Sequence, residues 1–373
     1  MKRKIRIDRV IVALVGLIIL VTLIFIPIHL YNLPSNKLKR LKYSSLAVNA
    51  MKEEKLYTKV LEKKKYSSTL DIALKTNNYV SDNFELYYEI DCKEEEACVK
   101  QINDLSLVGY KEKDITEIFS YLTKDDIDSV TNIAYISDLT SYISVTKFKM
   151  PNLERYILYK EETLTYEQCV LRVNVGLDKP FYSEVVDISN ESSHLVLVNK
   201  YRRLSADFVP EDLEKISTSC SNGEKFLSKV AKEAFEELCV DASSVNLSIK
   251  ASSAYRSYSY QANLYNSYVS SKGQKEADRS SAKPGHSEHQ TGLAIDVASG
   301  SNNYVKFGES DEYEWIKDNA HKYGFIIRYT KETEGITGYM DEPWHIRYIG
   351  KEIATYLYEN NMTYDEYYMK FID

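Results

Sequence analysis

Cysteine is scarce in this sequence, and positive charge is in the minority. Its five cysteines form no CxxC pair, which excludes a zinc ribbon and a CxxC redox motif. Cys92 and Cys98 are close enough in sequence for a local disulfide, but their spacing equally allows reduced thiols that pack as small apolar groups. The 48 Lys and Arg residues are outnumbered by 55 Asp and Glu, and the resulting net charge of −7 argues against nucleic acid as a partner.

Glycine is nearly absent from the middle of the chain, where only Gly109 and Gly176 fall between residues 31 and 222. Nine of the 13 glycines instead lie between Gly273 and Gly350. Because glycine favours turns and weakens helices, this contrast predicts a helical middle region followed by a turn-rich domain. With 373 residues, of which 44% are hydrophobic, the chain is long enough for two folded parts and is neither fibrous nor wholly disordered.

One long apolar run stands near the N-terminus. The 19 residues from Val10 to Ile28 include no charged residue, and Thr22 is the only polar one. As a helix this run is about 28 Å long, close to the roughly 30 Å hydrocarbon core of a bilayer. It lacks the polar stripe that a buried core helix normally shows, so it predicts a transmembrane helix.

The residues around this run predict how it is inserted. It is longer than the apolar part of a cleaved signal peptide, and no small-residue cleavage site follows it, so we expect an uncleaved, single-pass anchor. The basic residues that precede it favour a cytoplasmic N-terminus: Lys2, Arg3, Lys4, Arg6 and Arg9. Four basic residues also follow it: Lys37, Lys39, Arg40 and Lys42. Long domains cross membranes largely regardless of such charges, so we expect the rest of the chain outside the cytoplasm.

The glycine-poor region is predicted to be helical. Apolar residues recur three and four positions apart in 116–122 and 126–130, and Thr123 is placed as the N-cap of the second helix. Residues 153–158 follow a proline-containing turn at 150–152 and could form either a helix or a strand. No cluster of catalytic side chains occurs in this region.

Two segments near the C-terminus combine residue types that bind and use metal ions. The segment PGHSEHQTGLAID contains His289 and ends in Asp296, and the segment DEPWH contains Glu342 and His345. Two imidazoles and one carboxylate, with a fourth position open for water, form a catalytic zinc set. Zinc lowers the pKa of such a water towards 7, and a nearby glutamate can pass its proton to a leaving amine. Glu342, three residues before His345, is the candidate for that role.

The remaining histidines are interpreted as structural residues. Three of them have no partner in the sequence pattern: His29, His194 and His321. His286 lies three residues before His289 and would share its face in a helix, but the Pro-Gly pair at 284–285 favours a loop that enters a strand. We therefore expect His286 to lie outside the ligand set, and residues 293–297 to form a mostly buried strand.

These segments resemble the VanY-type D-alanyl-D-alanine carboxypeptidases, whose wider fold group includes lysostaphin-like peptidases and the hedgehog signalling domain. The family patterns S-x-H-x-x-G-x-A-x-D, E-x-W-H and Y-R-S-x-x-x-Q are matched at 287–296, 342–345 and 255–261. The three blocks occur in the family's order, and the resemblance covers residues 195–373. One departure from the family pattern is Thr330, which follows Arg328-Tyr329 at a position where the family often has proline. This departure affects the expected shape of the loop that follows and leaves the expected zinc chemistry unchanged.

The resemblance implies roles for nine residues of this chain. It implies a zinc ion (Zn²⁺) on His289, Asp296 and His345, with Glu342 as the general base and acid. It also implies that Arg256 stabilises the developing oxyanion or the substrate carbonyl, which suits a permanently charged group with several donors. Four further residues are expected to line the substrate site: Gln261, Ser287, Tyr339 and Trp344.

The expected fold is α+β, with a small antiparallel sheet and helices forming a zinc peptidase domain behind a mainly helical domain and a transmembrane helix. We expect a cytoplasmic tail and anchor in residues 1–30 and a helical spacer or wall-interaction domain in residues 31–180. Residues 181–373 are expected to form a zinc D,D-carboxypeptidase domain. An alternative for the middle region is additional core of that last domain.

The function implied by the resemblance is zinc-dependent hydrolysis of the C-terminal D-Ala from peptidoglycan stem peptides during cell-wall remodelling. The expected partners are the stem peptide and, through the N-terminal helix, the cytoplasmic membrane. Two alternatives are an L,D-carboxypeptidase acting on the tetrapeptide and an endopeptidase that cuts cross-bridges. A third alternative, of another class, is a non-catalytic, zinc-stabilised wall-binding module. Glu342 favours an enzyme, because a pure binding module needs no general base.

Overall fold

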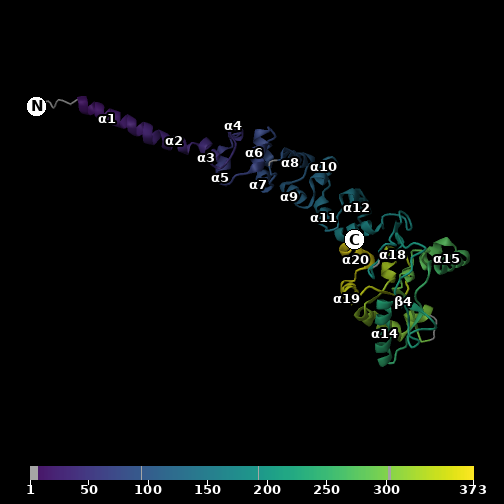
Figure 1. Cartoon of the computed structure of the whole chain (residues 1–373). Coiled ribbons are helices and arrows are strands. Elements are labelled where there is room, and N and C mark those ends of the chain that lie inside the picture. Colours follow the sequence, from purple (N-terminus) through teal and green to yellow (C-terminus); the bar gives the residue numbers. More distant parts are fainter. Residues whose placement is uncertain (1–6, 94, 192, 301–303) are drawn as a thin grey trace. The chain divides into compact units, whose positions relative to one another are not determined.

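The computed structural model describes residues 7–93, 95–191, 193–300 and 304–373 (Figure 1). By its internal contacts the chain divides into two compact units, Met1–Ser144 and Val145–Asp373. The first unit is built from helices, whereas the second combines helices with small sheets. The predicted mixture of helices and small sheets is therefore confirmed.

The predicted apolar helix is formed. It comprises α1 (Ile7–Leu20), a π-helical turn η1 (Val21–Phe25) and α2 (Ile26–Asn32), drawn in purple in Figure 1. Pro27 lies in the first turn of α2, and its missing backbone N–H accounts for the wider π-helical spacing just before it. The stretch Val10–Asn32 is long and apolar enough to cross a membrane. The retained anchor stays a prediction, and four of the basic residues used to orient it lie outside the described residues: Lys2, Arg3, Lys4 and Arg6.

Short helices make up the rest of the first unit: α3 (Pro34–Arg40), α4 (Ser45–Glu53), α5 (Tyr57–Lys63), α6 (Ser68–Lys75), α7 (Leu86–Glu89), α8 (Glu96–Val108), α9 (Glu112–Tyr121), α10 (Lys124–Thr131) and α11 (Leu139–Ile143). The predicted helices around 116–122 and 126–130 are confirmed as α9 and α10. Thr123 caps α10 as predicted, because its side chain accepts a hydrogen bond from the backbone N–H of Asp126. Cys92 and Cys98 form the local disulfide that their spacing left open.

The second unit begins earlier than the predicted boundary at 180–181. It opens with α12 (Leu153–Tyr159) and α13 (Tyr166–Val175), so residues 153–158 are helical. The apolar residues of α13 share one buried cluster with those of α20 (Tyr364–Phe371). Arg172 of α13 also pairs with Glu366 of α20 at 2.8 Å. The structural division therefore falls at residue 145, because the packing partners of α13 lie at the far end of the sequence.

The other elements of the second unit are β1 (Val186–Asp187), β2 (Arg202–Arg203), β3 (Leu213–Lys215), β4 (Phe226–Ser228), α14 (Lys229–Ser244), β5 (Ile249–Ser253), α15 (Tyr258–Lys272), α16 (Gln274–Ser280), β6 (Ala294–Ser299), α17 (Asp311–Asn319), β7 (Phe325–Ile327), α18 (Glu334–Thr337), β8 (His345–Tyr348) and α19 (Lys351–Asn360). The main sheet has four antiparallel strands in the order β5-β6-β8-β7. Two smaller pairs are β1-β2, which is parallel, and β3-β4, which is antiparallel.

The register of the main sheet positions two of the predicted ligands. Asp296 on β6 stands opposite His345 on β8 and opposite Ser253 on β5. Because successive side chains of a strand point to opposite faces, Ile295 and Val297 lie on the other face and join the main apolar core. All residues from 294 to 298 are buried, which confirms the predicted buried strand.

Candidate metal centre and active site

Three side chains converge at the centre of the main sheet. His289, Asp296 and His345 each offer one ligand atom, and these atoms lie within 4.8 Å of one another. All three residues are buried, and Asp296 Oδ1 lies 3.2 Å from both His289 Nε2 and His345 Nδ1. The strand register brings Asp296 to His345. The turn η4 (Glu288–Thr291), which ends at Gly292 in the left-handed region (φ +71°), brings His289 to both.

Each imidazole is oriented through its other nitrogen. His289 Nδ1 lies 2.7 Å from the backbone oxygen of Ala254, and His345 Nε2 lies 3.1 Å from Glu288 Oε2. A neutral imidazole that donates from one nitrogen presents a lone pair on the other, so these partners select the tautomers in which His289 Nε2 and His345 Nδ1 face the centre. Two oriented imidazoles and a carboxylate, all buried, fit a zinc ion.

Burial and neighbouring charges set the pKa values of these ligands. Burial, with the positive charge of Arg256, lowers the pKa of His289 to about 4, so this imidazole is neutral as a metal ligand must be. Burial opposes ionisation of Asp296, but His289 and Arg256 outweigh it and hold the pKa of this carboxyl well below its usual value. For His345, burial is outweighed by hydrogen bonds with Asp296 and Glu288, which raise its pKa to about 9. In the metal-free protein His345 therefore holds a proton that metal binding would release.

Glu342 lies beside this centre, in the turn that leads into β8. The backbone N–H of His345 donates to its carbonyl oxygen at 2.9 Å, and its own N–H donates to Tyr329 at 3.0 Å. Its Oε2 lies 3.8 Å from His345 Nδ1. Burial, with a contribution from the negative charge of Asp296, raises the pKa of Glu342 to about 7. A carboxyl group with a pKa near neutrality can both accept and donate a proton.

Arg256 follows β5 and is held against the predicted ligands. Its Nη2 contacts Asp296 Oδ2, and its Nε donates to Ser253 Oγ at 2.8 Å. Its backbone N–H donates to the carbonyl oxygen of His289 at 3.2 Å. The sequence did not predict the ion pair with Asp296, which ties this guanidinium to a candidate metal ligand.

One cavity of about 450 Å³ is lined by all nine predicted site residues. Among the predicted substrate residues, Gln261 donates from Nε2 to the backbone oxygen of Ala282 at 2.8 Å, whereas its buried Oε1 has no hydrogen-bond partner in the described part of the chain. Tyr339 lies 3.4 Å from Tyr182 through their hydroxyl groups. The structure thus brings the three sequence blocks to one cavity, while the role of each residue stays a prediction.

The same cavity contains residues that the sequence reasoning did not single out. The ring of Tyr329 lies 4.9 Å from those of both Tyr339 and His345. Glu288 stands between two predicted site residues, Ser287 and His289, and is fully buried. A signal for Glu288 was present, since it is a charged residue inside the S-x-H block, directly before a predicted metal ligand. At the departure from the family pattern, the backbone N–H of Thr330 donates to Thr333 Oγ1 at 3.0 Å, a bond that proline could not make.

His286 lies outside the candidate ligand group. Its Nδ1 lies 2.8 Å from the backbone oxygen of Asn199, and its ring meets that of Tyr182 edge-on at 5.0 Å. Its prediction as a structural residue agrees with these contacts.

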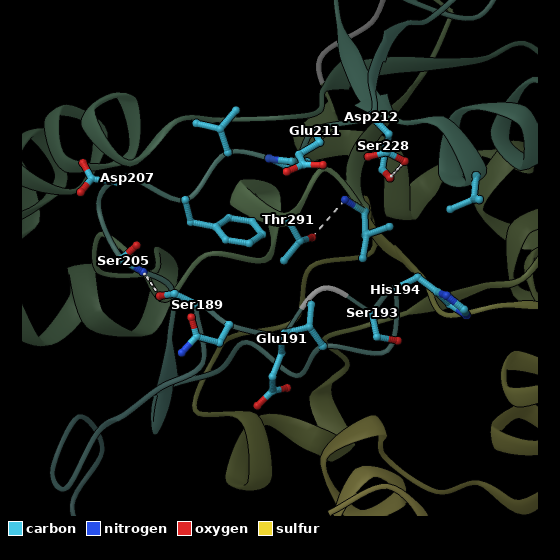
Figure 2. Close-up of a pocket in the computed structure, with 17 residues that line it drawn as sticks. Ser189, Glu191, Ser193, His194, Ser205, Asp207, Glu211, Asp212, Ser228 and Thr291 are labelled. Carbon is cyan, nitrogen blue, oxygen red and sulfur yellow. Dashed lines mark hydrogen bonds between the residues drawn. The ribbon is translucent and has the colours of Figure 1, made fainter.

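A second cavity, of about 750 Å³, is shown in Figure 2. None of the nine predicted site residues lines it. Its wall mixes polar and apolar side chains, and it includes four carboxylates: Glu191, Asp207, Glu211 and Asp212. In Figure 2, Asp212 accepts a hydrogen bond from Ser228 at 2.6 Å. Thr291 and Leu293 line this cavity, and Ser287 to His289 line the other, so the η4 segment contributes to both.

Comparisons with known proteins give a consistent result. The family model described as "VanY: D-alanyl-D-alanine carboxypeptidase" matches residues 224–351. The putative carboxypeptidase YodJ of Bacillus subtilis (strain 168) is 41% identical over 190 residues, which are 49% of this chain and 70% of that protein. The D-alanyl-D-alanine carboxypeptidase of Enterococcus faecium is 32% identical over 214 residues, which are 56% of this chain and 61% of that protein.

Among solved structures, the LdcB LD-carboxypeptidase is similar to this chain with a TM-score of 0.47 and 39% identity. The similarity covers 50% of this chain and 91% of that one.

Proposed function

Because this chain belongs to the family of VanY-type D-alanyl-D-alanine carboxypeptidases, we propose that it hydrolyses the C-terminal D-Ala from peptidoglycan stem peptides and that it requires zinc. The observation that supports this most strongly is the cavity around His289, Asp296 and His345. Eight residues from three separate sequence blocks line this cavity together with Tyr339, and a partly buried carboxyl group with a pKa near 7, that of Glu342, stands beside the three ligands.

In this proposal His289, Asp296 and His345 hold the zinc ion. When bound, zinc supplies a Lewis acid that polarises the scissile carbonyl and lowers the pKa of a bound water. Glu342 takes up the proton of the attacking water and passes it to the amino group of the leaving D-Ala. A pKa of about 7 suits both halves of this task, because the carboxyl group is easily ionised and easily reprotonated at neutral pH.

Arg256 and Gln261 orient the substrate in this proposal. Arg256 provides a permanent positive charge beside Asp296. This charge would stabilise the negative charge that develops on the carbonyl oxygen of the substrate during attack. Gln261 Oε1 is a buried acceptor without a partner among the described residues, so a substrate N–H would complete its hydrogen bonding. Ser287, Tyr339 and Trp344 form other parts of the same wall.

We further propose that the catalytic unit acts outside the cytoplasmic membrane and is tethered by the apolar helix. The support is the stretch Val10–Asn32, which is long and apolar enough to span a bilayer. Residues 31–180 remain proposed as a spacer or wall-interaction region, although their last part, α12 and α13, belongs to the second unit. Protease added to intact spheroplasts should digest the C-terminal unit. Protection of that unit would contradict the topology and, with it, action on assembled peptidoglycan.

The activity is tested with the full chain in detergent, incubated with equal concentrations of penta-, tetra- and tripeptide stems and with cross-linked dimers. Mass spectrometry should show conversion of the pentapeptide to the tetrapeptide as the fastest reaction. Faster loss of the tetrapeptide would replace the D,D assignment with the L,D one, and cleavage of the dimers would indicate an endopeptidase. Zinc binding without any product would indicate a binding module.

A further inference from the structure

A line of buried charged side chains joins the C-terminal helix to the candidate metal centre. Asp365 Oδ2 lies 2.8 Å from Arg328 Nη1, and Arg328 Nε lies 2.9 Å from Glu288 Oε1. Arg347 Nη1 reaches the same Glu288 oxygen at 3.1 Å, while Glu288 Oε2 lies 3.1 Å from His345 Nε2. The two carboxylates and two guanidinium groups in this line are at most 1% exposed.

The line is balanced in charge, with two positive and two negative groups. A buried charge is tolerated only when it is paired and hydrogen-bonded, so each member depends on the others. Arg347 has additional partners, because its Nη2 donates to the backbone oxygens of His194 and Val196 at 3.1 and 2.8 Å. Arg328 has fewer: its Nη2 has no hydrogen-bond partner in the described part of the chain. Asp365 and Glu288 are the two carboxylates that balance Arg328.

The start of α20 is built to face these guanidinium groups. Asp365 Oδ1 accepts a hydrogen bond from Asn199 Nδ2 at 2.8 Å, which fixes the carboxylate from its other side. The ring centre of Tyr364, the preceding residue, lies 5.8 Å from Arg328 Cζ and 5.6 Å from Arg347 Cζ. Aromatic faces attract cations at such distances. Two consecutive residues of one helix therefore stabilise the same buried positive charge.

Glu288 is the point where this line meets the metal centre. Its Oε1 contacts the two guanidinium groups, which leaves Oε2 for the N–H of His345. If Asp365 lost its charge, the attraction of Arg328 for Glu288 would be unbalanced. The guanidinium would then compete with His345 for the carboxylate, and the imidazole would lose its fixed orientation. Partners behind a metal ligand typically change metal affinity by about 10–100-fold when they are altered.

We propose that Asp365 is a positioning residue of the metal centre: through Arg328 and Glu288 it fixes the orientation of the His345 imidazole and so raises the affinity for zinc. The inference rests on the proposed zinc site. It assigns a role in that site to the C-terminal helix, which lies beyond the residues matched by the family model.

The test uses the full chain in detergent and measures zinc affinity by competition with a chromophoric chelator. Asp365→Asn keeps the size of the side chain and the acceptor for Asn199, so zinc should bind about 10-fold more weakly. The matched control is Glu366→Gln on the next position of the same helix. Glu366 is also buried and ion-paired, but its partner is Arg172 of α13, so this change should lower the melting temperature and leave zinc affinity unchanged.

A compensating variant separates positioning from general destabilisation. Asp365→Asn combined with Arg328→Gln removes one charge of each sign and leaves Glu288 paired with Arg347 and His345. This variant should fold even if Asp365→Asn alone does not, and it should recover most of the lost affinity. The visible spectrum of the cobalt-loaded protein, which reports ligand geometry, should change in Asp365→Asn and return in the double variant.

The outcomes distinguish this inference from the proposed function. A wild-type chain that binds no zinc would overturn both. A wild-type chain that binds zinc, together with an Asp365→Asn variant of equal affinity, would overturn only the role of Asp365. That role would also be overturned by a double variant that binds zinc no better than the single one.

Discussion

The two units of this molecule differ in how many charged side chains they bury. In the described part of the first unit, Asp71 is the only charged residue that is buried, and its Oδ1 accepts the backbone N–H of Ser44 at 2.7 Å. The second unit buries Lys200, Glu288, Asp296, Arg328, Arg347, Asp365 and Glu366, together with His286, His289 and His345. Burying charge is costly unless every group is paired, so the fold of the second unit depends on the pairing of its buried charged side chains.

This difference separates structure held by local signals from structure held by distant partners. The helices of the first unit are encoded by nearby residues, such as the cap of α10 at Thr123. The candidate metal centre instead needs residues from η4, β6 and β8 to meet, and Glu288 behind it needs Arg328 and Arg347. Perturbations of the metal or of the buried charges should therefore affect the second unit and spare the first.

The largest effect is expected from removing the metal. Dialysis of the full chain against a chelator should abolish stem-peptide hydrolysis, and added zinc should restore it. The reason is that zinc is the Lewis acid that polarises the scissile carbonyl in the proposed mechanism. Circular dichroism should show the helices of the first unit unchanged. Full activity in a sample shown by elemental analysis to be metal-free would break the proposed link between the buried ligands and catalysis.

The disulfide of the first unit tests whether the stability of that unit is independent of the metal centre. Cys92 and Cys98 are six positions apart, and closing so short a loop stabilises a fold by about 2 kcal/mol in the chain-entropy treatment. Replacing both cysteines with serine should lower the free energy of unfolding of the first unit by about that amount in urea titrations. Turnover and zinc content should stay at wild-type levels. A loss of zinc in this variant would show that the two units are coupled.

The smallest effect concerns acid and His286 in the second unit. Burial lowers the pKa of this imidazole to about 4, below the value of about 6.5 in an unfolded chain. The unfolded state therefore binds the proton first, so stability is fully present above pH 6.5 and is lost as the pH falls towards 4. The loss is at most about 2 kcal/mol at pH 5. His286→Gln should reduce the difference in unfolding free energy between pH 8 and pH 5 by that amount, and an unchanged difference would contradict the assignment.

The sequence predicted most of what depends on neighbouring residues. Amphipathic spacing predicted α9 and α10, a continuous apolar run predicted α1 to α2, and the mostly apolar segment at 293–297 predicted β6. Eight of the nine site residues were predicted because they lie in three compact blocks with a known family pattern, and Tyr339 was predicted from the resemblance alone. All nine line one cavity.

Features that depend on distant residues were not predicted. The charged partners behind Glu288 are Arg328 and Arg347, and Arg328 pairs in turn with Asp365. These residues are scattered along the sequence, where each one resembles a solvated surface charge. The contact-based division at residue 145 differs from the predicted boundary at 180–181, because the contacts of α13 with α20 leave no local signal. The Cys92–Cys98 pairing was left open for a related reason, since spacing permits a bridge without requiring one.

The division of labour between metal binding and catalysis is tested most directly by Glu342→Gln in the full chain, with zinc content and turnover measured on the same sample. The variant keeps the size and hydrogen bonding of the side chain but removes the base, so we predict about one zinc ion per chain and a fall in turnover of about 10²–10⁴-fold. In parallel, His345→Ala should lose both metal and activity, and His286→Ala should keep the metal. A Glu342→Gln protein that is fully active, or that contains no zinc, would contradict the proposed role of Glu342 as a base beside the metal.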